Sequence, residues 1–161
     1  MIFLQDIKSR SVYWVLFPVL TALLMLLHYF ESGGQVLSWQ PAIFNLAFFI
    51  GQLLLVTVYF SLKNKKLTNI TSELLGIGDV FFILSVAFYL SIFNFLFFYI
   101  VSLILVLIAW LVWQAVSANK SKHIPLAGMQ AIVFILFLIC GWFFKALSLT
   151  NDTWILNLMG R

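Results

Sequence analysis

The chain has 161 residues and a mass of 18.5 kDa; 64% of its residues are hydrophobic and only 9% are charged. Soluble domains have roughly 45–50% apolar and about 25% charged residues. With nine basic and five acidic side chains, a soluble globule of this size would expose large apolar patches and aggregate. The composition therefore excludes a soluble domain, and the high hydrophobicity excludes a disordered chain.

The net charge of +4 does not indicate a nucleic-acid partner, because basic residues in a membrane protein report on topology first. The expected partner is the lipid bilayer. The single cysteine, Cys140, lies in an apolar run, so neither a disulfide framework nor a thiolate metal site is expected. His28 and His123 fall at opposite ends of the predicted spans, so no convergent ligands for haem or a metal are predicted.

Long stretches of the chain lack charge: 20 uncharged residues separate Arg10 from Glu31, and 40 separate Asp79 from Lys120. A membrane-spanning helix needs about 20 apolar residues, so the longer stretch has room for a helical hairpin. The alternation typical of transmembrane barrel strands is missing. The predicted fold is therefore all-α: one integral-membrane helix bundle over residues 1–161, with about five spans at 12–30, 40–61, 77–92, 95–117 and 124–144. The hairpin is expected to turn around Asn94; the alternative is one long tilted helix.

The basic residues predict the orientation of the five spans. Seven of the nine fall on one side of the membrane: Lys8, Arg10, Lys63, Lys65, Lys66, Lys120 and Lys122. The positive-inside rule assigns that side to the cytoplasm. The C-terminal stretch 150–161 is then outside, where apolar side chains such as Trp154 are expected to rest on the membrane interface.

Three of the five acidic residues, Glu31, Glu73 and Asp152, fall in predicted loops and are expected to be solvated. Asp79 differs, because it closes the tetrapeptide Gly76-Ile77-Gly78-Asp79 directly before the 40-residue apolar stretch. One interpretation makes Asp79 a helix N-cap, for which aspartate is a preferred residue. The other is that the two glycines leave room for an extended substrate to approach its carboxylate.

Asp6 opens the segment Asp6-Ile7-Lys8-Ser9-Arg10 just before the first span. In one interpretation it is a surface acid paired with Lys8 or Arg10, which contributes little energy. In the other it pairs with Asp79, since the predicted topology returns both to the same membrane face. Two facing carboxylates share a proton because both cannot ionise cheaply. The ionised member then activates water while the protonated one polarises a carbonyl, which is the chemistry of an aspartic protease.

Three landmarks, in the same order along the chain, resemble type IV prepilin peptidases and archaeal preflagellin peptidases. Gly76 to Asp79 matches the family's GxGD signature at a helix start. Asp6 and Arg10 match the D-x-x-x-R segment of its other catalytic aspartate, and residues 124–126 resemble the Ile-Pro-Phe/Leu-Gly segment of a late helix. The resemblance implies an aspartyl endopeptidase that cuts leader peptides of pilin-like precursors at the cytoplasmic face of a prokaryotic inner membrane.

In such an enzyme, catalysis would fall to Asp6 and Asp79, with Gly76 and Gly78 shaping the substrate's approach. No metal or organic cofactor is implied. The family has a full transmembrane helix before its first aspartate, whereas five residues precede Asp6. The resemblance therefore implies either a sixth, N-terminal helix or a protein that works without one.

Two other functions stay open. A catalytically inactive relative could act as a membrane scaffold or assembly factor, which is favoured by Phe81 at the place where the family commonly has lysine. An unrelated small transporter or channel subunit is the second alternative; against it, the sequence predicts no ionisable side chain deep within a span. No small-xxx-small glycine pair predicts an oligomeric state.

Overall fold

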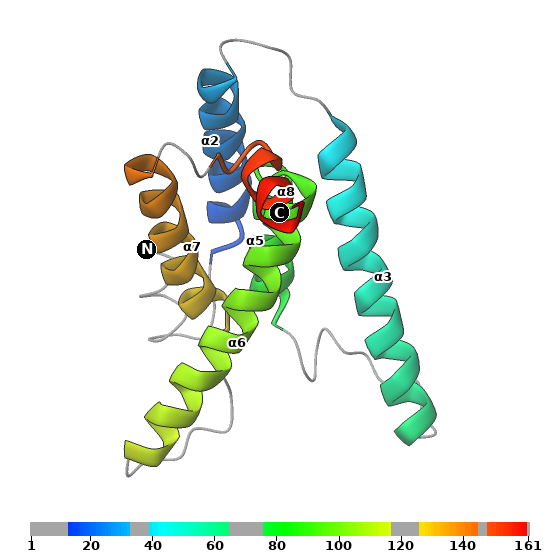
Figure 1. The fold of residues 1–161 in the computed structure, drawn as a ribbon. Coiled ribbons are helices and arrows are strands. Elements are labelled where there is room, and N and C mark those ends of the chain that lie inside the picture. The colour runs from blue at the N-terminus through cyan, green and yellow to red at the C-terminus, as the bar shows by residue number, and fades with distance from the viewer. Residues whose placement is uncertain (1–12, 33–38, 65–75, 117–125, 145–147, 161) are drawn as a thin grey trace.

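A computed structural model describes residues 13–32, 39–64, 76–116, 126–144 and 148–160. Within these ranges the chain forms helices α2 (Leu16–Glu31), α3 (Trp39–Asn64), α5 (Ile77–Ala87), α6 (Ile92–Val116), α7 (Leu126–Phe143) and α8 (Thr153–Met159). Figure 1 shows their arrangement, and the described residues include no strand. The predicted all-α class is therefore confirmed for this part of the chain.

Helices occupy all five places in which the sequence predicts a span, but their lengths differ. Three of them, α3, α6 and α7, are long and apolar enough to cross a membrane. The other two are shorter, with 16 residues in α2 and 11 in α5, where about 20 are needed to span a bilayer. The structure therefore supports a membrane protein with three candidate spans, and it does not confirm five.

The predicted hairpin turns at residues 88–91, which places Asn94 in the first turn of α6 instead of in the loop. A side chain of α3 holds the end of α5. The amide of Asn45 in α3 donates hydrogen bonds to the carbonyl oxygens of Ala87 (3.1 Å) and Leu90 (2.9 Å). Carbonyls at a helix end need such partners inside an apolar bundle. The interpretation of this stretch as one long helix is therefore wrong.

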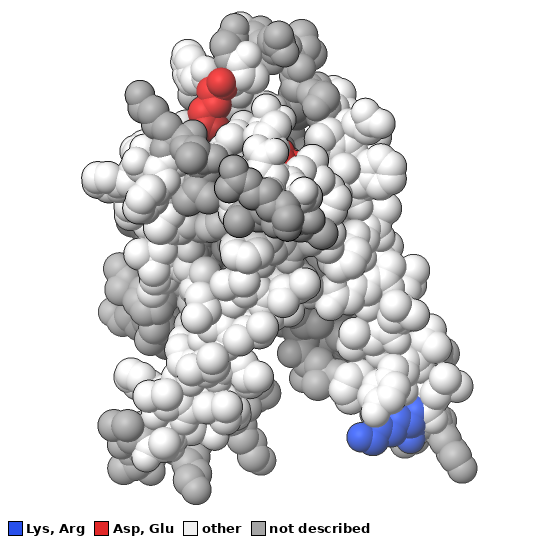
Figure 2. Space-filling model, viewed as in Figure 1, with Lys and Arg blue, Asp and Glu red and all other residues white. Residues whose placement is uncertain are grey.

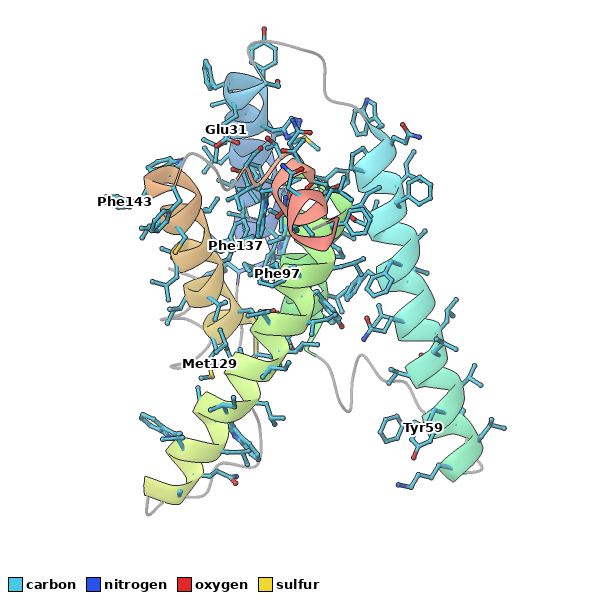
Figure 3. The ribbon with its side chains drawn as sticks, viewed as in Figure 1. Glu31, Tyr59, Phe97, Met129, Phe137 and Phe143 are labelled. Atoms are coloured by element: carbon cyan, nitrogen blue, oxygen red, sulfur yellow. The ribbon has the colours of Figure 1, made fainter. Side chains whose placement is uncertain are left out.

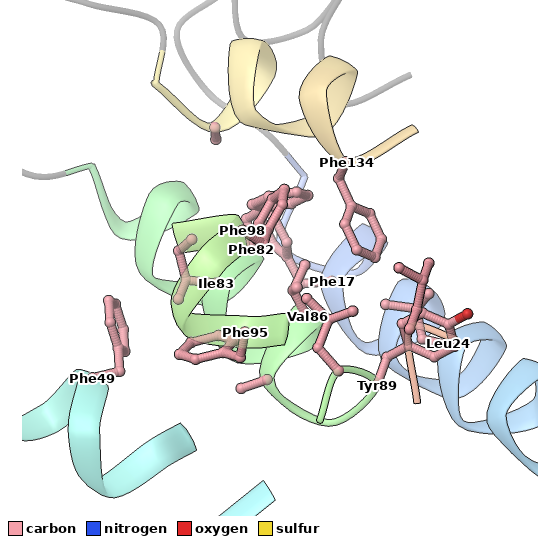
Figure 4. Close-up of a cluster of buried hydrophobic side chains, with 14 residues drawn as sticks. Phe17, Leu24, Phe49, Phe82, Ile83, Val86, Tyr89, Phe95, Phe98 and Phe134 are labelled. Carbon is pink, nitrogen blue, oxygen red and sulfur yellow. The ribbon is translucent and has the colours of Figure 1, made fainter. Parts of the chain in front are cut away.

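An aromatic core joins α5, α6 and α7 (Figure 4). The ring of Phe134 in α7 lies 6.1 Å from that of Phe82 in α5 and 5.3 Å from that of Phe98 in α6. Helix α2 packs along α5, where the rings of Phe17 and Phe81 stack at 5.8 Å. Helix α3 packs against both α5 and α6. The short helix α5 thus lies among three of its neighbours, and six of its 11 residues are buried.

The outer surface of the bundle is apolar. Figure 2 shows acidic atoms near one end of the molecule, basic atoms at the foot of α3, and mostly uncharged surface between them. Large apolar side chains point away from the bundle, as Phe143 at 81% exposure does in Figure 3. Such a band suits contact with lipid tails, which offer no hydrogen-bond partners.

The orientation can be tested by labelling single cysteines in a Cys140→Ala background. An impermeant maleimide added to intact cells should label a cysteine at Asn151 but not one at Thr71, because seven of the nine basic residues would then lie inside. Permeabilising the cells should make the Thr71 variant reactive as well. Labelling of the Thr71 variant in intact cells would reverse the predicted orientation.

Candidate functional site

Asp79 lies in the first turn of α5 and is only 9% exposed. It shares one face of the helix with Phe82, Ile83 and Val86, which are buried in the core. Residues spaced by three, four and seven positions lie on the same side of a helix. The carboxylate is therefore on the face that packs inside the bundle, away from lipid.

Two hydrogen bonds link Asp79 to Gly76, one through the carboxylate and one through the backbone. The Gly76 N–H donates to Asp79 Oδ2 (3.0 Å), and the Asp79 N–H donates to the Gly76 carbonyl oxygen (3.0 Å). Gly76 occupies the N-cap position and Asp79 the third helical position, so the interpretation of Asp79 itself as the N-cap is wrong. Its bond back to the cap residue is the acidic half of a capping box.

The two glycines of the motif lie in this same turn. A methyl group added at Gly76 would lie 3.2 Å from Asp79 Oδ2, closer than ordinary van der Waals contact. Gly78 is half-buried and directly precedes the aspartate. The Asp79 carboxylate therefore occupies space that a side chain at position 76 would need. This is a role for Gly76 beyond that of a flexible loop residue.

Asp6 and Arg10 lie outside the described residues, so the predicted pair of aspartates is neither brought together nor separated. The start of α2, however, lies beside α5. The Ser85 hydroxyl oxygen of α5 lies 3.3 Å from the Phe17 carbonyl oxygen, in the first turn of α2, and 2.8 Å from the Phe81 carbonyl oxygen of its own helix. The chain thus enters α2 next to the helix whose first turn contains Asp79. The third landmark, residues 124–126, leads into α7, which begins at its last residue.

Two more polar side chains lie at the level of Asp79. Ser102 of α6 and Gln130 of α7 are both fully buried, and the Gln130 amide nitrogen lies 3.5 Å from the Ser102 hydroxyl oxygen. Each of the three lies one helical turn from the core phenylalanine of its own helix, on the side away from the 88–91 turn. The pairs are Asp79 with Phe82, Ser102 with Phe98, and Gln130 with Phe134. We call Asp79, Ser102 and Gln130 the polar layer. It lies directly beneath the aromatic core.

The polar layer lies deeper than the sequence indicates. Helix α6 continues for 14 residues beyond Ser102, which is about 21 Å at 1.5 Å per residue. In Figure 1, α3 and α6 both extend well past the first turns of α5 and α7. Asp79 is therefore level with the middle of α6, although it lies in the first turn of its own helix, at the end of the predicted span.

A second polar cluster, at the opposite end of the bundle, was not predicted from the sequence. Asn94 is fully buried, and its amide nitrogen lies 3.1 Å from each of the carbonyl oxygens of Ser148, Leu149 and Asn151. Its Oδ1 accepts a hydrogen bond from the indole N–H of Trp154 (3.0 Å). Trp154 is therefore tied to α6, in addition to any contact with the membrane interface.

Asp152 completes this cluster, so its interpretation as a solvated loop acid is wrong. Its Oδ1 accepts hydrogen bonds from the Ser91 hydroxyl (2.5 Å) and from the backbone N–H groups of Phe93 (3.1 Å) and Asn94 (3.3 Å). A carboxylate in this place satisfies the free amides at the start of α6 and complements the helix dipole. We call Ser91, Asn94, Asp152 and Trp154 the outer clamp.

Glu31 is the last residue of α2 and not a loop residue; it is exposed, as predicted, but it also has a structural partner. The Tyr89 hydroxyl donates to both of its carboxylate oxygens, at 3.0 and 3.2 Å. Burial raises the pKa of Tyr89, and the charge of Glu31 raises it further, so the phenol stays protonated and keeps donating. A polar pocket of about 360 Å³ opens beside this pair, lined also by His28.

Among the described residues, no group of three or more His, Cys, Asp and Glu side chains is arranged to hold a metal ion. The chain also has no match among known protein families, curated proteins or solved structures.

Proposed function

We propose that this chain is a membrane-embedded aspartyl endopeptidase, similar to prepilin peptidases, that cuts leader peptides of pilin-like precursors at the cytoplasmic side of the membrane. The observation that carries this proposal is the setting of Asp79. Its carboxylate is buried on the core face of a short helix, beside two glycines, and is held by a backbone N–H. A catalytic carboxylate needs such restraint from rigid neighbours.

Asp6 supplies the second carboxylate in this proposal. Its support is the packing of α2 along α5, which brings the chain entering α2 to the helix that carries Asp79. The ionised aspartate takes a proton from water, whose oxygen attacks the scissile carbonyl, while the protonated aspartate donates to the carbonyl oxygen. When the C–N bond breaks, the leaving nitrogen takes up a proton and the pair returns to its starting state.

The first experiment is a cleavage assay with purified protein in detergent or liposomes and a panel of pilin-like precursors. Cleavage should occur at one position between the basic leader and the hydrophobic helix. It should be unchanged by a metal chelator, because the proposed mechanism uses two carboxylates and no metal. A loss of cleavage on chelation, restored by added metal, would replace the aspartyl mechanism with a metal-dependent one.

A transporter or channel subunit is the second candidate, because an ionisable side chain deep in a helix bundle is typical of transport pathways. Asp79 in the polar layer fits this description. Proton or cation flux into liposomes that contain the protein, lost in Asp79→Asn, would favour this function. If the wild-type protein neither cleaves precursors nor supports flux, the inactive scaffold is the better explanation.

A further inference from the structure

Gln130 carries a buried acceptor that the fold does not use. The residue is 0% exposed, and its Oε1 has no hydrogen-bond partner among the described residues. An unpaired polar atom in an apolar interior is costly, and more so inside a membrane protein. Such an atom in a native structure calls for an explanation, and a donor that arrives with a ligand is one.

The neighbouring hydroxyl determines which end of the amide is left free. The Ser102 hydroxyl donates its proton to the Tyr99 carbonyl oxygen (3.0 Å), so its oxygen is available only as an acceptor. The Gln130 Nε2 group lies 3.5 Å from that oxygen and is the donor that fits it. The amide is therefore oriented with nitrogen toward Ser102 and with Oε1 free to accept.

The position of Gln130 restricts the kind of donor. Asp79 lies on the core face of α5, which packs against α7 where the rings of Phe82 and Phe134 meet. Asp79 and Gln130 each lie one helical turn before these rings, so we infer that they lie at the same level of the bundle. A peptide cut at Asp79 must be extended there, and an extended strand has backbone N–H groups that no helix satisfies. These groups are donors without charge, which suits a neutral amide oxygen in an apolar site.

We propose that Gln130 Oε1 accepts a backbone N–H of the extended leader peptide and so positions the scissile bond against Asp79. This inference rests on the proposed peptidase function. Gln130 is a positioning residue that binds the substrate backbone, and Ser102 orients its amide. Because the contact is present in both the bound substrate and the transition state, it contributes to KM more than to kcat.

The test measures binding separately from cleavage. A fluorescently labelled leader peptide is titrated onto detergent-solubilised Asp79→Asn protein, with and without Gln130→Leu, and its anisotropy is followed. Gln130→Leu should weaken binding about tenfold, the effect of one hydrogen bond worth about 1.4 kcal/mol. In the cleaving protein the same substitution should raise KM about tenfold and leave kcat within about twofold. The melting temperature should be equal or higher, because an unpaired buried polar atom is removed.

Gln52→Leu is the matched control, since Gln52 is also a glutamine with an unpaired Oε1, but on α3. It should leave peptide affinity unchanged. Gln130→Met, which keeps the length of the side chain, provides a second variant in case leucine packs badly. Peptide affinity unchanged in a folded Gln130 variant would overturn the inference, even if precursors are cleaved. If Asp79→Asn with Gln130 intact binds no leader peptide, the inference fails as well, whereas chelator-resistant cleavage reports on the proposed function independently.

Discussion

Asp79→Asn should reduce cleavage of a leader-bearing precursor to the background of a reaction without enzyme, and Asp6→Asn should do the same. Asparagine has nearly the size of aspartate, and its Oδ1 can still accept the Gly76 N–H that now lies 3.0 Å from Asp79 Oδ2. The first turn of α5 should therefore stay folded. What asparagine cannot do is ionise to activate water or pass a proton to its partner. Cleavage is measured by gel shift of the precursor, and folding by the thermal midpoint in detergent.

Glu73→Gln is the control for this pair, because it also removes an acidic group from the predicted cytoplasmic side. It should cleave like the wild type. Normal cleavage by Asp6→Asn would show that no aspartate pair operates, and Asp79 would then be a helix-start residue alone. Gly76→Ala should give a partial loss, since its methyl group would press on the Asp79 carboxylate at 3.2 Å and displace it.

Composition and spacing are sufficient to predict an α-helical membrane protein with helices in five places. They are insufficient to predict how long α5 is, because its apolar run continues through the turn at 88–91. That turn depends on partners far away in the sequence. Asn45 binds the carbonyls at the end of α5, and Asp152 caps the start of α6. Neither contact can be predicted from the sequence of the apolar run itself.

At the candidate site, too, features set by adjacent residues could be predicted, and features set by contacts between distant helices could not. The motif at Gly76–Asp79 singles out the aspartate as a candidate from four adjacent residues. Its depth in the bundle follows from the shortness of α5 and could not be predicted. Ser102 and Gln130 were missed because each is a single polar residue in a long apolar helix. The usable signal was their spacing: Gln130 lies four residues before Phe134, and Ser102 four after Phe98, on core faces.

The outer clamp leads to the largest expected effect on stability. Asn94→Leu should lower the free energy of unfolding by about 3 kcal/mol, because the carbonyl oxygens of Ser148 and Asn151 and the Trp154 indole N–H lose their shared partner. The Leu149 carbonyl oxygen keeps the Ser91 N–H as a donor. Each buried polar group left unpaired costs about 1–3 kcal/mol, and water entering at the outer end offsets part of the sum. The measurement is the unfolding midpoint in mixed detergent and SDS micelles, followed by tryptophan fluorescence and circular dichroism.

Asn157→Leu is the matched control, since Asn157 is an exposed asparagine of α8; it should change the unfolding free energy by less than about 0.5 kcal/mol. Trp154→Phe removes the indole donor to Asn94 Oδ1 while keeping an aromatic ring beside Phe97, and should cost about 1 kcal/mol. The two clamp substitutions share one contact, so the double variant should lose less than the two single losses combined. Strict additivity would mean that Asn94 and Trp154 act independently. An Asn94→Leu protein as stable as the wild type would mean that the outer clamp does not hold α8 and the 148–152 segment to α6.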